Sequence, residues 1–565
     1  MTKPEHDYRD GDVIYLENDS GGQAYEVVKG KVEISRAGDK GKSILAVVRP
    51  GEAFGGRNST ANGLRASTAR AVGRTLIKAI SEPASAAAAV FEVPAQAVEK
   101  NVLPKKGFFR WLLGKEDGGA HPGRIEIMVA ALAGEVREVA GDQTDHLVAA
   151  LGNRKRVRVR RLNKVPAMDL GDRTSPTAAI PREKLLSAAV IARQWLAQSG
   201  ADLLIWGEVP EPGMTLYLRF IPAETEGEDK PGLFGLAATL ILPANFGPEL
   251  AEILLAVSLA AVVTQNEKKL VGLNEQRAES LAAIMPIIKH LPPGLTTRER
   301  SAVKMCFGNV LAGEAARRNS LDLYQMAAQT YRAALEGISH NASPFDWAIA
   351  HKHLGSVLQA LGERTNDKET LNAAAAAFGE ALKVLTKGDN PGEWATTQNR
   401  LGLTFYKLDL IAGDTERIKL ALTAFQSALQ VFTRSETPQL WAEALNNFAQ
   451  AAQVLGEQLR NPEVLEKAAN ACRSALEVRK KEKQPLLWAA TQNNLGSALF
   501  LLGKLKKDLI PLRESAEAFG KAYDFYKAYG AEKMAATAKK NLSHVERLLE
   551  KHSPNERPDE SEKMD

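Results

Sequence analysis

The sequence has few of the features that mark membrane, secreted or disulfide-bonded proteins. Its 565 residues include two cysteines, Cys306 and Cys472, which excludes a disulfide framework or a cysteine-based zinc site. The longest apolar run, Leu250–Val263, contains Glu252 and is shorter than the roughly 20 residues that cross a bilayer. The polar amino terminus lacks the apolar core of a secretory signal. We therefore expect a cytoplasmic protein without a transmembrane segment.

Catalytic and metal-binding motifs are also missing. The sequence contains no P-loop, no nucleophile elbow and no HExxH motif, and its nine histidines are scattered. His351 and His353 are two residues apart on an expected helix, so they point in different directions and do not share a metal. A net charge of +5 is small for this length and gives no general argument for DNA binding. We expect no enzyme activity, no metal and no cofactor.

The sequence does contain an internal repeat of 47 residues, which spans residues 300–552. Its markers are tryptophans 47 positions apart, each with a proline three residues earlier: Trp347, Trp394, Trp441 and Trp488, with Pro344, Pro391, Pro438 and Pro485. We interpret the tryptophans as core residues that mark no cofactor. Two other columns keep the same step of 47 residues. One contains small residues, Gly308, Gly355, Gly402, Ala449 and Gly496, and the other contains mostly large ones, Tyr331, Phe378, Phe425, Cys472 and Phe519.

Each copy of the repeat predicts two amphipathic helices. In one copy, apolar residues at helical spacing predict helices over Trp394–Leu408 and Ile418–Phe432. Neither helix buries its apolar stripe alone, so stacked copies share one core. The array resembles a tetratricopeptide-repeat solenoid, although its step exceeds the usual ~34 residues, which predicts longer helices or loops. The resemblance implies a surface that binds a protein or peptide partner.

Asparagine recurs in two neighbouring columns of the array. Stacked asparagines on one solenoid face can hydrogen-bond the backbone of an extended peptide. The alternative is that they satisfy neighbouring helix ends or face water. The candidate peptide-binding residues are Asn399, Asn446 and Asn493 in one column, and Asn447 and Asn494 in the next.

The first hundred residues alternate short β-rich runs with turn signals, which predicts a small all-β roll. The segments Gly11–Tyr15, Ala24–Ile34 and Gly51–Thr68 resemble the cyclic-nucleotide-binding domain of catabolite activator proteins and protein kinase A regulatory subunits. The expected strands are Asp12–Leu16, Ala24–Val28, Lys31–Ser35, Ser43–Val48 and Thr75–Ile80.

In that family, Gly51–Thr68 is a phosphate cassette, whose backbone N–H groups and one arginine hold a cyclic phosphate. The resemblance implies that Arg65 pairs with the phosphate of cAMP or cGMP, with help from Arg57. The candidate ligand-binding residues are Gly51, Glu52, Phe54, Gly55, Gly56, Arg57, Asn58, Ser59, Arg65, Ala66 and Ser67.

One cassette position departs from the family pattern. The family glutamate that holds the ribose 2′-hydroxyl is matched by Gly56, and losing such a hydrogen bond costs about 1.5–3 kcal/mol. The change also makes the cassette more positive around Arg57 and Arg65. Three interpretations stay open: cAMP or cGMP binding, binding of another phosphate-bearing ligand, and a purely structural β-roll. Ala84–Lys100 is the candidate lid over the ligand.

Between residues 124 and 270 the pattern alternates strands and helices. This order, with the run Gly200–Val209, resembles the TolB-type α/β domain and implies an interaction domain. The expected strands are Ile125–Leu132, Arg156–Leu162, Ala201–Glu208, Met214–Ile221 and Ala238–Leu242, and the expected helices are Thr144–Leu151, Arg182–Gly200 and Gly247–Val263.

The run Arg154–Arg161 places arginines on one face of an expected strand. Such a stripe binds nucleic acid or an acidic partner, or is a solvated strand face. No aromatic residues interleave with it, and no helix-turn-helix follows the β-roll, so we expect no DNA partner.

These patterns predict a multidomain protein: an all-β cyclic-nucleotide-binding-type roll (1–104), a linker (105–123), a small α/β domain (124–270), a connecting helix (271–299), an all-α tetratricopeptide-like solenoid (300–552) and a disordered tail (553–565). The leading hypothesis is a signalling adaptor that senses a cyclic nucleotide and binds a protein partner. The alternatives are a ligand-independent scaffold with a degenerate β-roll and, less favoured, a nucleic-acid-binding regulator.

Overall fold

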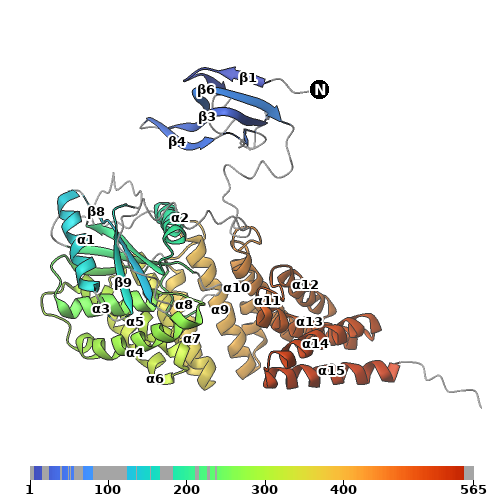
Figure 1. The fold of residues 1–565 in the computed structure, drawn as a ribbon. Helices are drawn as coiled ribbons and strands as arrows, with labels where there is room; N and C mark the ends of the chain where they lie inside the picture. Colours follow the sequence, from blue (N-terminus) through green and yellow to red (C-terminus); the bar gives the residue numbers. More distant parts are fainter. Residues whose placement is uncertain are drawn as a thin grey trace, which may run out of the picture. The chain divides into compact units, whose positions relative to one another are not determined.

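The computed structural model describes residues 5–15, 24–38, 41–48, 50, 53–55, 68–80, 124–134, 137–152, 154, 156–165, 182–209, 215–224, 230–235 and 238–552. The chain divides into two compact units, Met1–Asp117 and Gly118–Asp565. The first contains a β-sheet, and the second contains a mixed sheet followed by paired helices (Figure 1). Among the described helices, none is long and apolar enough to cross a bilayer.

Antiparallel strands form the sheet of the first unit, in the order β1-β6-β3-β4, with β2 paired to β6 and β5 paired to β3. Strand β3 is continuous, so the two strands predicted on either side of Gly30 are one strand with irregular pairing near Lys29. Strand β1, which precedes the first predicted strand, was not predicted, because its polar sequence has no alternating apolar pattern. The strands are β1 Glu5–Tyr8, β2 Val13–Tyr15, β3 Ala24–Gly38, β4 Gly41–Val48, β5 Ala53–Gly55 and β6 Thr68–Ile80.

The core of this sheet is small and aliphatic. Val27 and Ile77 face each other across β3 and β6, and both are fully buried. Gly30 has a φ of +89°, and a Cβ there would lie 2.6 Å from the Arg74 carbonyl oxygen, so this bend requires glycine. The buried core residues are Val27, Val32, Ile34, Val48, Ala69 and Ile77.

A mixed sheet opens the second unit, in the order β12-β11-β10-β7-β9, with β8 paired to the end of β10. Strand β7 is parallel to β9 and β10, whereas β10, β11 and β12 are antiparallel neighbours. The predicted order of strands and helices is confirmed, although α1 begins earlier than predicted. The elements are β7 Ile125–Ala130, β8 Ala133–Gly134, α1 Arg137–Leu151, β9 Val157–Leu162, α2 Arg182–Ser199, β10 Leu203–Val209, β11 Thr215–Pro222, β12 Leu240–Pro243 and α3 Pro248–Ala261.

Helices cover both faces of this sheet. Helix α2 packs Leu196 and its alanines against Leu204 and Trp206 on one face. Helices α1 and α3 cover the opposite face, which includes Ile127 and Ile205. A strand covered on both sides is mostly apolar, and all of β10 is buried, with Glu208 as its one charged residue.

Helix pairs follow the sheet, and their long first helices begin 47 residues apart, at Pro344, Pro391, Pro438 and Pro485. These first helices have 21 or 22 residues, which accounts for the long repeat step. The helices are α4 Glu267–Lys289, α5 Thr297–Arg318, α6 Leu321–Leu335, α7 Pro344–Thr365, α8 Lys368–Leu382, α9 Pro391–Ala412, α10 Thr415–Leu429, α11 Pro438–Gln458, α12 Pro462–Val478, α13 Pro485–Lys506, α14 Leu509–Ala528 and α15 Glu532–His552.

Helix ends repeat along the array as well. Proline occupies the first turn of α7, α9, α11 and α13, where its missing N–H would have no helical partner. Four of the long helices end in a left-handed residue: Asn319, Asn366, Gly413 or Lys507. Each short helix begins at a side-chain cap, which stabilises a helix by about 1 kcal/mol. The caps also lie 47 residues apart: Ser320, Asp367, Asp414, Asn461 and Asp508.

Within each helix pair, a small residue of the long helix contacts a larger residue of the short helix. A Cβ added to Gly402 would lie 2.8 Å from Phe425 Cε1, so the ring rests directly on the backbone of α9. In the α11–α12 pair, Ala449 and Cys472 occupy these two positions. The same glycine–aromatic contact joins Gly308 to Tyr331, Gly355 to Phe378 and Gly496 to Phe519.

The repeat tryptophans lie at the rim of the core rather than fully inside it. All four are half-buried, because they occupy the first turn of a long helix beside the preceding connection. Trp394 packs against the apolar clusters of two successive helix pairs. The tryptophans therefore contribute to packing between repeats.

One hydrophobic core joins the mixed sheet to the first helix pairs. It extends from Ile125 through α3, α4 and α5 to Phe378 on α8. At Gly232, with φ of +88°, a Cβ would lie 2.3 Å from the backbone nitrogen of Gly313 on α5, so the β11–β12 connection meets that helix closely. The α/β region and the start of the array are packed as one body.

Candidate functional sites

Little of the predicted phosphate cassette belongs to the described residues. Strand β5 pairs with β3 in the register Ala24↔Gly55 and Tyr25↔Phe54, which places the start of the cassette at one end of β3. The other candidate ligand-binding residues lie outside the described residues: Gly51, Glu52, Gly56, Arg57, Asn58, Ser59, Arg65, Ala66 and Ser67. The candidate lid over residues 84–100, the linker over residues 105–123 and the tail over residues 553–565 also lie outside them.

Polar contacts fix β1 and the turn after it against β6. Arg74 forms an ion pair with Asp7 at 2.7 Å, and this hydrogen-bonded partner lowers the pKa of the Asp7 carboxyl. The Asp10 carboxylate accepts the Gly73 N–H at 2.7 Å. These exposed contacts order the β1–β2 edge of the sheet.

The asparagine columns lie between successive repeats. Asn399 on α9 is 4% exposed, donates to Glu443 at 3.1 Å and accepts from Asn447 at 3.3 Å, both on α11. A peptide that used Asn399 would have to replace these two bonds. The structure therefore gives this residue an internal role, and its peptide binding stays a prediction.

Asn446, 47 residues after Asn399, also bonds to the following repeat. The Asn446 side-chain oxygen accepts from Asn494 at 3.1 Å and from Thr491 at 3.2 Å, both on α13. Asn493 is half-buried, and its side-chain oxygen has no partner among the described residues. Of the predicted peptide-binding residues, Asn493 and Asn494 are the more accessible.

Lys352 belongs to the same column, and the sequence-based prediction missed it. It lies 47 residues before Asn399 and donates to Glu393 of the following repeat at 2.6 Å. Lys352 is 9% exposed, so this is a largely buried ion pair. Extending the asparagine column by one more step would have found it.

The arginine stripe of β9 is paired with carboxylates of the α/β region and of α4. Arg160 contacts Glu126 at 2.8 Å, and β9 is the edge strand of the sheet. Charged side chains along an edge strand oppose pairing with other chains. The arrangement favours a structural role over nucleic-acid binding. The remaining pairs are Arg154 with Glu252, Arg156 with Glu275, Arg158 with Glu126 and Arg161 with Asp145.

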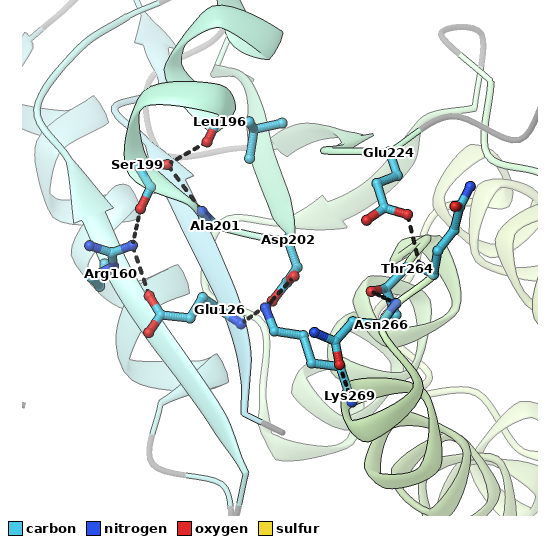
Figure 2. A network of polar contacts seen from close by, with 11 residues as sticks. Glu126, Arg160, Leu196, Ser199, Ala201, Asp202, Glu224, Thr264, Asn266 and Lys269 are labelled. Atoms are coloured by element: carbon cyan, nitrogen blue, oxygen red, sulfur yellow. Dashed lines mark hydrogen bonds and ion pairs between the residues drawn. The ribbon is translucent and has the colours of Figure 1, made fainter. Parts of the chain in front are cut away.

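A polar network joins the start of β10 to α4 (Figure 2). Asp202, 8% exposed, accepts the Glu126 N–H at 2.8 Å and the Lys269 ammonium at 2.7 and 2.9 Å. Asn266 caps α4 by accepting the Lys269 N–H at 3.2 Å. The network anchors the helix that leads into the array.

A buried ion pair lies on the α2 face of the sheet, near the end of β10. Arg219 Nη1 is 3.6 Å from Glu208 Oε1, and the two residues are 7% and 1% exposed. The Arg219 guanidinium also lies 5.5 Å from the centre of the Trp206 ring. Breaking such a pair from one side leaves a buried charge, which is strongly destabilising. The alternation of the strands did not reveal this pair.

Both cysteines are free and buried. Burial raises the pKa of the Cys306 and Cys472 thiols to about 12, so neither is a thiolate at neutral pH. Within the described ranges, no group of three or more histidine, cysteine, aspartate or glutamate residues is arranged to hold a metal ion.

Comparison with known families identifies the first unit. Residues 5–88 match the family model described as "Cyclic nucleotide-binding domain". The matched range spans the predicted cassette, Gly51–Thr68, and Arg65. No curated protein matches this chain.

Several solved structures are similar to a small part of the chain. The catabolite activator protein of Thermus thermophilus is 33% identical, over 14% of this chain and 37% of that one, with a TM-score of 0.13. FixK2 from Bradyrhizobium japonicum is 26% identical over 14% and 39%, with a TM-score of 0.13. The cAMP-bound form of the EAL enzyme Bd1971 is 28% identical over 14% and 21%, with a TM-score of 0.13. Each match spans less than half of the other protein.

Proposed function

We propose that this chain is a cytoplasmic signalling adaptor that binds a cyclic nucleotide through its first unit and a protein partner through a tetratricopeptide-type array. The observation that carries the proposal is the match of residues 5–88 to the cyclic nucleotide-binding domain. The TolB-like α/β region serves as an interaction domain and anchors the array. The proposed role is binding, without catalysis.

The proposed ligand is cAMP or cGMP, held at its phosphate by Arg65 and by the N–H groups of the cassette. Gly56 stands where the family has the glutamate that holds the ribose. We therefore expect weaker ribose recognition than a complete cassette gives, while Arg57 and Arg65 favour the phosphate.

The partner-binding role is supported by the layered helix pairs, which leave side chains of several repeats on one extended surface. Within the asparagine columns, Asn493 and Asn494 are less buried than Asn399, and Asn494 donates to Asn446 of the preceding repeat.

The test is a thermal-shift and calorimetry panel on the full chain with cAMP, cGMP, cCMP, cUMP and cyclic dinucleotides. A ligand at 100 times its Kd should stabilise the first unit by about 2.7 kcal/mol. Arg65→Ala should abolish the shift and leave the circular dichroism spectrum unchanged. An equal shift in Arg65→Ala would show that the pocket is assigned wrongly.

The alternative is a ligand-independent scaffold with a structural β-roll, which the Gly56 substitution favours. It predicts no shift with any of these nucleotides, and unchanged partner binding after deletion of residues 1–100. Nucleic-acid binding through β9 is less favoured, because its arginines are paired with carboxylates of the same chain. That function would require strongly salt-dependent DNA or RNA binding.

A further inference from the structure

The first tryptophan of the array packs against two histidines. Trp347 lies in the first turn of α7, and its ring centre is 4.2 Å from that of His351, one turn later on the same helix. The ring of His340, in the α6–α7 connection, lies 4.7 Å from the indole and is nearly perpendicular to it. Trp347 therefore shields part of the His351 imidazole from water.

The repeat register shows that these histidines belong to one copy. The residues equivalent to His351 in the next three copies cannot gain a proton between about pH 5 and 8: Gln398, Leu445 and Gln492. The residues equivalent to His340 are lysine or arginine: Lys387, Arg434 and Lys481. Of the four copies that carry the tryptophan, this one places imidazoles beside it.

The surroundings of His351 favour the neutral imidazole. The side chain is half-buried, and its Nδ1 has no hydrogen-bond partner among the described residues. Protonation would place an N–H group and a positive charge there, and a buried donor without an acceptor is destabilising. Burial accordingly lowers the pKa of His351 from its ordinary value of 6.5.

Charged groups of α8 also act on this imidazole. The Glu380 carboxylate raises its pKa, and the Lys383 ammonium lowers it. These two side chains bind each other at 2.7 Å, so their effects largely cancel. On α7, Asp346 interacts electrostatically with Arg298 and Arg219 instead. Burial therefore decides the direction of the shift.

We propose that the first turn of α7 is an acid-sensitive joint, in which protonation of His351 displaces the Trp347 ring. The charged imidazole becomes fully hydrated only when that ring moves away. Trp347 packs against the same apolar cluster as Met305 of α5 and Trp394 of α9, so its displacement loosens contacts among the first three helix pairs. Because the folded state favours the neutral ring, the joint is intact above pH 6.5 and loses stability as the pH falls from there to the lower folded-state pKa.

Hydrogen exchange of the full chain, followed by mass spectrometry, tests this joint against references in the same molecule. Exchange of amides 347–351 is compared with that of the equivalent amides 394–398 and 488–492, whose copies carry glutamine in place of His351. This ratio removes the intrinsic dependence of exchange on pH. Between about pH 7.5 and pH 5, amides 347–351 should gain speed relative to both references, by up to about tenfold for each unit of the pKa shift. An unchanged ratio would overturn the proposal.

Two variants separate the histidines. His351→Gln gives this copy the residue of the reference copies and should remove the relative acceleration. His340→Gln is the matched control, because it removes the other imidazole beside Trp347 and leaves His351 in place, so the acceleration should persist. Circular dichroism and the Tm at about pH 7.5 establish that both variants are folded. An acceleration that persists in His351→Gln, or that is lost in His340→Gln, would contradict the assignment of the joint to His351.

Discussion

Cys472→Phe tests how the helix pairs pack. In four pairs a glycine faces an aromatic ring, whereas the α11–α12 pair combines Ala449 with Cys472. Alanine is larger than the glycine of the other pairs, and cysteine is smaller than their aromatic residue. We interpret these two differences in side-chain volume as compensating each other. Phenylalanine at position 472 should therefore clash with Ala449 and fit once that residue is glycine.

The glycine contacts give the size of the effect. A Cβ at Gly402 or Gly496 would lie 2.8 Å from the facing ring, well inside van der Waals contact. Overpacking of this kind costs about 1–3 kcal/mol, so Cys472→Phe alone should destabilise the array by that amount. Ala449→Gly alone should cost roughly 1 kcal/mol through helix propensity. The free energy of unfolding of the double variant should exceed the value expected from adding the two single changes by about 1–3 kcal/mol.

Scanning calorimetry of the parent, the two single variants and the double variant measures this coupling as differences in the Tm of the array. Cys472→Ala is the control, because it keeps a small side chain and should show little coupling to Ala449→Gly. If Cys472→Phe lowers the Tm equally with alanine and with glycine at position 449, the volume-exchange argument is wrong.

Three further predictions concern buried groups. Burial raises the pKa of Asp409, so the folded state favours the neutral acid and loses stability as the pH rises from the unfolded-state pKa to the folded-state pKa. Asp409→Asn should therefore raise the free energy of unfolding at pH 7 by about 1.4 kcal/mol for each unit of that pKa shift, which raises the Tm and flattens its dependence on pH. Cys306 and Cys472 should not react with Ellman's reagent at pH 8 until the chain is unfolded. Gly207→Ala should destabilise the α/β region by 3 kcal/mol or more, on the order of the largest core effects, because its Cβ would lie 2.0 Å from the Tyr217 carbonyl oxygen.

The contrary results are equally definite. A lower Tm for Asp409→Asn would mean that the carboxylate stabilises the fold. Reaction of either thiol in the native chain would contradict its burial. An unchanged Tm for Gly207→Ala would show that β10 and β11 can separate locally, and Gly235→Ala, which meets nothing within 4 Å, is the matched control.

The repeat could be predicted because residues that recur at a fixed step of 47 positions are visible in the sequence itself, without the tertiary structure. Proline at the helix start, as at Pro391, and the glycine opposite Phe425 follow from that step together with helix geometry. The succession of strands and helices along the α/β region was also accessible, since apolar runs such as Leu203–Val209 alternate with helical patterns. The continuity of β3 could not be predicted, because a glycine such as Gly30 indicates a turn in the sequence, whereas in the structure it forms a bend within a paired strand.

The partners of the polar residues could not be predicted in the same way. Lys352 bonds to a residue 41 positions later and Asn399 to residues 44 and 48 positions later, so none of these contacts follows the repeat step itself. Glu126 and Asp202 meet only because β7 and β10 are adjacent and parallel in the sheet. Tertiary topology decides such contacts, and a single sequence does not state it.

The continuous core between the sheet and the first helix pairs has a mechanical consequence. It ends at α8, and beyond that helix the array is held by separate, smaller apolar clusters. Up to α8 the helices share one core, so a disturbance of any contact there acts on the whole of it. Beyond α8 a partner can open one cluster and leave its neighbours in place, so the later helix pairs respond to a load one at a time.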